Sequence, residues 1–138
     1  MPKVTVSIKG TQIIDGEEDV TEFMSSGEMS VDADGITLKY FDSVSMGIEN
    51  VETELNICGG AVTLTRNKGK LGQLIIEENQ RHLCPYYTPY GDFTIGISGD
   101  KVDNRLMNGG ILILKYTIDL NSQLMSNNIV EITVGEEK

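Results

Sequence analysis

The sequence predicts an all-β protein, and three observations lead to that prediction. Apolar and polar residues alternate along segment after segment, which is the pattern of a β-strand with one buried face. Turn signals rich in Gly, Asn and Asp separate these segments, as a meander of antiparallel strands requires. No segment keeps an apolar helical stripe for more than a turn. We therefore expect about eight to ten strands in a single domain covering residues 1–138.

The clearest predicted strand begins after Gly110. Five of its side chains share an apolar face: Leu112, Leu114, Tyr116, Ile118 and Leu120. Polar side chains alternate with them on the other face, so only one register buries all five. The same alternation assigns an inward face to five further segments: Val4, Val6 and Ile8; Val51, Thr53, Leu55 and Ile57; Val62, Leu64 and Arg66; Phe93, Ile95 and Ile97; Val130, Ile132 and Val134.

Turns, a bulge and two short helices complete the predicted elements. The expected turns are Asp15-Gly16, Asp34-Gly35, residues 67–69, Gly99-Asp100, residues 108–110 and Asn127-Asn128. Ser25-Ser26-Gly27 interrupts a long strand-like segment over residues 20–31 and predicts a β-bulge there. Residues 80–84 and 102–107 are the only segments where a helix of a turn or two is expected.

So many strands with so little helix need protection for their edges, and closure into a barrel provides it. A barrel of about eight strands has an interior that its own side chains fill or that holds one small ligand. A two-sheet β-sandwich of similar strand count is the alternative, because periodicity alone does not separate the two architectures.

The charge balance excludes two classes of partner. Lys and Arg number 11 and Asp and Glu number 21, so the net charge is -10. Nucleic-acid backbones and anionic membranes both require a basic face. We therefore expect no nucleic-acid partner and no membrane partner.

The sequence also predicts a soluble, cytoplasmic protein. Its opening residues alternate polar and apolar side chains and lack the continuous apolar core of a signal peptide. The longest strongly apolar run covers only residues 111–114, whereas a bilayer span needs roughly 20 residues. In a reducing cytoplasm, Cys58 and Cys84 are expected to be unpaired thiols without metal, since they lack Cys-x-x-Cys spacing.

Catalytic machinery is not evident in the sequence. His82 is the single histidine, and no nucleophile motif accompanies it. Residues 32–35 resemble a fragment of a calcium loop, but Phe41 occupies the position where a bidentate glutamate belongs. We expect no catalytic residues, no cofactor and no metal, so a non-catalytic protein is the more natural expectation than an enzyme.

Four residues are candidates for a ligand site: Arg66, Tyr87, Tyr90 and Tyr116. Arg66 shares a face with Leu64 if alternation persists, and an inward guanidinium needs a carboxylate on a ligand or an internal partner. The alternative is that the strand has ended and Arg66 opens the next turn in solvent. Tyr87 and Tyr90 flank a rigid turn where phenols would either rim a barrel mouth or plug it.

Several motifs resemble the YwiB-like family, small bacterial proteins of unknown function. The resemblance rests mainly on Tyr87-Thr88-Pro89-Tyr90-Gly91 and on the long strand with Leu112, Tyr116 and Asp119-Leu120-Asn121. It covers residues 4–134 in outline. It implies a calycin-like (lipocalin-like) β-barrel, tilts Arg66 toward the interior and implies no established activity.

Two functions from different classes remain at this point. The first is a barrel that binds a small apolar or amphipathic ligand, carboxylate-bearing and held inside. The second is a protein-interaction module whose acidic surface or strand edge meets a partner or a second copy of the chain, giving a homodimer. An interior cavity filled by water or by a ligand, with Arg66 or Tyr90 on its wall, would separate them.

Overall fold

The computed structural model describes residues 3–42, 51–66, 72–88, 91–107 and 109–136, and these residues form ten strands. The strands are β1 (Lys3–Ile14), β2 (Glu17–Asp32), β3 (Gly35–Asp42), β4 (Val51–Cys58), β5 (Ala61–Arg66), β6 (Gln73–Glu77), β7 (Arg81–Thr88), β8 (Gly91–Arg105), β9 (Ile111–Leu120) and β10 (Gln123–Glu136). All neighbouring strands pair antiparallel.

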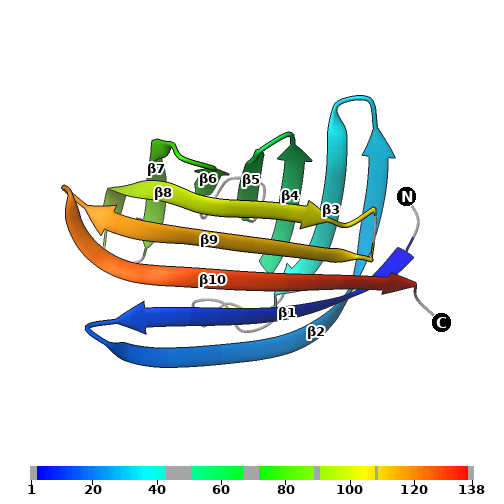
Figure 1. Ribbon diagram of the computed structural model, residues 1–138, viewed down its shortest axis with the longest axis horizontal. Helices are drawn as coiled ribbons and strands as arrows, with labels where there is room; N and C mark the ends of the chain where they lie inside the picture. The colour runs from blue at the N-terminus through cyan, green and yellow to red at the C-terminus, as the bar shows by residue number, and fades with distance from the viewer. Residues whose placement is uncertain (1–2, 43–50, 67–71, 89–90, 108, 137–138) are drawn as a thin grey trace.

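The sheet curls until its two edge strands meet. Its strand order is β6-β5-β4-β3-β2-β1-β10-β9-β8-β7, so β6 and β7 are the edges. In Figure 1, β8, β9, β10 and β1 run across the view and β3, β4 and β5 run steeply behind them, with β2 bending from one layer into the other. The Ile75 N–H of β6 donates to Cys84 Sγ of β7 at 3.4 Å. The predicted all-β fold is confirmed, and it is a nearly closed barrel, consistent with a calycin-like barrel, rather than the alternative β-sandwich.

Backbone contacts around Gly99 complete the closure where β6 leads into β7. Glu78 forms an isolated parallel bridge with Gly99. The Asn79 N–H donates to the Gly99 carbonyl at 2.9 Å, and the Gly99 N–H donates to the Gln80 carbonyl at 3.0 Å. We call this contact, formed by residues 77–80 and Gly99, the seam. The seam takes the place of a regular ladder of backbone hydrogen bonds between β6 and β7, which are the two edges of the sheet.

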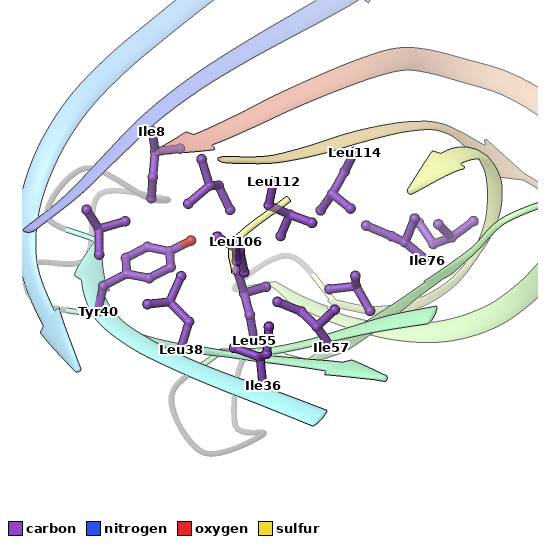
Figure 2. Packing of buried hydrophobic residues seen from close by; sticks show 14 of the residues in the cluster. Ile8, Ile36, Leu38, Tyr40, Leu55, Ile57, Ile76, Leu106, Leu112 and Leu114 are labelled. Carbon is purple, nitrogen blue, oxygen red and sulfur yellow. The ribbon is translucent and has the colours of Figure 1, made fainter. Parts of the chain in front are cut away.

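The hydrophobic core lies between the two crossing layers (Figure 2). The predicted register of β9 is confirmed, because Leu112 and Leu114 are buried while Tyr116, Ile118 and Leu120 pack against the core. Strands β3 and β4 supply most of the opposing layer. Their buried hydrophobic residues are Ile36, Leu38, Tyr40, Leu55 and Ile57.

Three predicted turns are confirmed, one of them at Gly109-Gly110 between β8 and β9, and two are wrong. Asp15-Gly16 joins β1 to β2, and the turn at Asp34-Gly35 joins β2 to β3. Asn127-Asn128 is not a turn, because both residues lie inside β10; the chain reverses instead at Asn121 and Ser122, which have φ of 53° and 69°. Gly99-Asp100 is not a turn either, since β8 runs through it with a bulge between Gly99 and Lys101.

The predicted helices and the predicted bulge of β2 are also wrong. Residues 81–84 belong to β7, and Val102 to Arg105 continue β8, because pairing with neighbouring strands outweighs weak local preference. Strand β2 pairs with β1 without a register shift through Ser25, Ser26 and Gly27. The turn expected at residues 67–69 lies outside the described residues.

An ion pair crosses three strands on the outer surface. Arg81 of β7 donates to Asp119 of β9 through Nε at 3.0 Å and Nη2 at 2.6 Å. Gly96 of β8 lies beneath it, where an added Cβ would meet both side chains. The hydrogen bond from Arg81 lowers the pKa of Asp119. The deprotonated carboxylate is therefore favoured in the folded state.

This pair predicts a pH-dependent contribution to stability. Because the pKa of Asp119 is lower in the folded than in the unfolded state, its carboxylate stabilises the protein at pH values above the ordinary carboxyl pKa of about 4. This contribution disappears as the pH falls through the lowered pKa of the folded state. We expect Asp119→Asn to lower the melting temperature at pH 7 and to have a much smaller effect near pH 2. Asp100→Asn, on the exposed part of β8, is the control. An equal effect of Asp119→Asn at both pH values would contradict the prediction.

Candidate functional site

Arg66 ends β5 and faces the barrel interior. It follows Leu64 by two residues and pairs directly with Thr53 of β4, so all three side chains share the inner face. The residue is half-buried, and its Nε is shielded from solvent. The alternation of β5 therefore persists to its last residue, and the side chain does not open a turn in solvent.

Tyr116 lies on the opposing layer of the barrel, and the charge of Arg66 affects the pKa of its phenol. Burial raises the pKa of the Tyr116 phenol, and the positive charge of Arg66 acts in the opposite direction. A neutral phenol is thus favoured, available both as a donor and as an acceptor. Arg66 on β5 and Tyr116 on β9 are distant in the sequence. In the folded protein they lie close enough for the charge of Arg66 to act on the phenol.

Three buried polar side chains extend this region, and we call the five residues together the polar interior: Thr53, Arg66, Tyr116, Ser126 and Asn128. Asn128 pairs directly with Tyr116 across β9 and β10. Its Nδ2 donates to Ser126 Oγ at 3.0 Å. Sequence reasoning missed the two β10 residues, because Asn127-Asn128 has the composition of a turn. The inward register of Val130 and Ile132, continued two residues upstream, was the signal that could have found Asn128.

The other two candidate tyrosines are not part of this arrangement in the described structure. Tyr87 lies on β7 an odd number of residues from the buried Cys84, so it faces outward, with 37% of its surface exposed. Tyr90 lies outside the described residues. Of the four candidates, the structure therefore brings together Arg66 and Tyr116.

The single histidine has a structural contact. His82 Nε2 lies 2.8 Å from Glu77 Oε1, which connects the start of β7 to the end of β6. His82 therefore links the two edge strands of the sheet.

The two thiols are free, with Cys58 exposed and Cys84 buried. Burial raises the pKa of Cys84, which the Ile75 N–H partly offsets. A thiol with a raised pKa has little of the thiolate that reacts or binds metal. Among the residues that the structure describes, no group of three or more His, Cys, Asp or Glu side chains could hold a metal ion.

One open hollow on the surface is lined by side chains of both charges. It lies across β1 to β4, with Lys3, Glu28, Lys39 and Glu52 on its walls. Lys39 also pairs with Glu54 at 3.5 Å. These alternating charges neutralise each other across the strands, so they hold the outer face together rather than attract a charged ligand.

The fold and the polar interior define the class of this protein as a small antiparallel β-barrel with an arginine directed inward. The described chain contains no helix of the length and apolarity that a membrane crossing requires.

The chain belongs to the family described as "Domain of unknown function (DUF1934)", whose pattern matches residues 6–132. The barrel is similar to the crystal structure of the ywiB protein from Bacillus subtilis, with a TM-score of 0.84 and 17% sequence identity over 99% of this chain and 93% of that one. The resemblance noted from the motifs is thereby confirmed. No curated protein matches the sequence.

Proposed function

We propose that the barrel binds a small, partly apolar carboxylate in its interior, with Arg66 as the anionic anchor. The observation that carries the proposal is the inward direction of Arg66, whose Nε is shielded from solvent and whose side chain shares the inner face with Leu64 and Thr53. A guanidinium in such surroundings is costly unless negative charge is near it. Its planar fork matches the two oxygens of a carboxylate.

Apolar side chains on the inner faces of β5 and β9 suit the remainder of such a ligand. Leu64 precedes Arg66 on the inner face of β5, and Ile118 and Leu120 follow Tyr116 on the inner face of β9. All three are only partly buried. An amphipathic carboxylate would cover this apolar surface while its charged end meets Arg66. The two free thiols favour a reducing compartment, so we propose that the protein acts in the cytoplasm.

The alternative, an interaction module that pairs through a strand edge, has less support. The edges of β6 and β7 face each other, linked by the bond from Ile75 to Cys84. Edges covered in this way are poor templates for adding a strand from another molecule. We therefore favour the interior ligand over an edge-paired homodimer.

Replacing Arg66 with leucine tests the proposal. We expect decanoate to bind the wild-type protein and Arg66→Leu to weaken that binding by about 30-fold or more, because a charge-assisted bidentate contact is lost. Isothermal titration calorimetry measures both affinities. Lys115→Leu, on the exposed outer face of β9, is the charge-matched control and should bind as the wild type does.

Two outcomes would contradict the proposal. One is equal binding of decanoate by the wild-type protein and Arg66→Leu. The other is that a panel of straight-chain and aromatic carboxylates gives no binding to the wild-type protein at all.

A further inference from the structure

Thr53 of β4 holds a buried hydroxyl group that no described residue of the barrel satisfies. The residue is fully buried, with 0% of its surface exposed. Its Oγ1 has no hydrogen-bond partner among the residues that the structure describes. A buried hydroxyl without a partner destabilises a protein, so such a group calls for a specific explanation.

The position of Thr53 suggests where its partner belongs. Thr53 pairs directly with Arg66 on one side and with Tyr40 on the other. Directly opposed residues of antiparallel strands have Cβ atoms about 5 Å apart on the same face. The Thr53 hydroxyl therefore lies on the inner wall beside the base of the Arg66 side chain, next to the place where an anion would meet the guanidinium.

We propose that Thr53 is a second ligand-contacting residue, which donates its hydroxyl proton to the carboxylate that Arg66 holds; this inference rests on the proposed function. A carboxylate offers about four lone-pair sites, and a bidentate guanidinium uses two of them. One oxygen thus remains able to accept a bond from Thr53 Oγ1. The pair selects acids over the matching primary alcohols, whose single oxygen cannot accept from both residues in the same geometry.

Two variants separate the hydroxyl group from the shape of the side chain. Thr53→Val keeps the shape and removes the hydroxyl, whereas Thr53→Ser keeps the hydroxyl and removes a methyl group. We expect Thr53→Val to bind decanoate about tenfold more weakly than the wild type, the cost of one charge-assisted hydrogen bond. Its ligand-free melting temperature should equal or exceed that of the wild type, since an unsatisfied buried hydroxyl is gone. Thr53→Ser should show the reverse, with near-normal affinity and a lower melting temperature.

Thr53→Val should thus lose affinity but not stability, and Thr53→Ser should lose stability but not affinity. A purely structural role of Thr53 would not produce these opposite effects. Equal decanoate affinity in the wild type and Thr53→Val, or a lower melting temperature in Thr53→Val, would overturn the role of Thr53. If Arg66→Leu still weakens binding by about 30-fold or more in that case, the proposed function survives without Thr53. If the wild type binds no carboxylate, the proposed function fails and this inference fails with it.

Discussion

Shortening Leu114 to alanine is expected to lower the free energy of unfolding by about 2 to 5 kcal/mol. Leu114 is 1% exposed in the middle of β9, and Figure 2 shows it directed into the core between the two layers. Its cross-strand neighbours are Val130 and Val102. The substitution removes its isopropyl group and leaves a cavity. β9 is paired on both sides, so it cannot move inward to fill that cavity.

Urea unfolding followed by circular dichroism measures this loss. Leu124→Ala removes the same atoms from a residue that is 60% exposed, so it should cost less than about 0.5 kcal/mol. A loss below about 1 kcal/mol for Leu114→Ala would contradict the core described here. Total stabilities of small domains are about 5 to 15 kcal/mol, so the expected loss is a large share of the total.

The strands could be predicted because their burial pattern is local. On β9 and β5 the apolar residues recur at every second position, and that spacing alone orients Leu114 and Arg66 toward one face. No knowledge of the neighbouring strands is needed for this step. The same argument placed Thr53 on the inner face of β4 from the sequence.

The composition of the polar interior could not be predicted in the same way. Whether the Thr53 hydroxyl has a partner depends on which side chains β5 and β3 place beside it, and that is a property of the assembled barrel. Asn128 was not predicted to be buried, because Asn is typical of turns. In the barrel its side-chain amide donates a hydrogen bond to Ser126. Tyr87 was misleading because a cluster of tyrosines does not reveal which member faces outward.

The sequence predicts a closed barrel, but the contact that closes it could not be predicted by local reasoning. Gly99-Asp100 has the composition of a turn, yet Gly99 lies within β8 because segment 77–80, from the opposite edge of the sheet, packs directly against its backbone. A missing side chain permits a close approach as readily as it permits a turn. Only the three-dimensional pairing distinguishes the two uses of glycine.

Replacing Gly99 with alanine is therefore expected to open the seam and to cost about 3 kcal/mol or more. A Cβ at this position would meet the carbonyl oxygen, carbonyl carbon and amide nitrogen of Glu77. All of these are backbone atoms, so no side-chain rotation relieves the clash. The hydrogen bonds that Gly99 makes with Asn79 and Gln80 would lengthen as the two segments separate.

Gly60→Ala is the matched control, because a Cβ at Gly60 would have nothing within 4 Å. Denaturant unfolding should show a large loss for Gly99→Ala and little change for Gly60→Ala. Hydrogen exchange should show selective loss of protection at the amides of Asn79 and Gly99, because opening is local to the edge strands before it becomes global. Equal stability of the two variants would mean that residues 77–80 do not press on Gly99, and that the barrel is closed by some other contact.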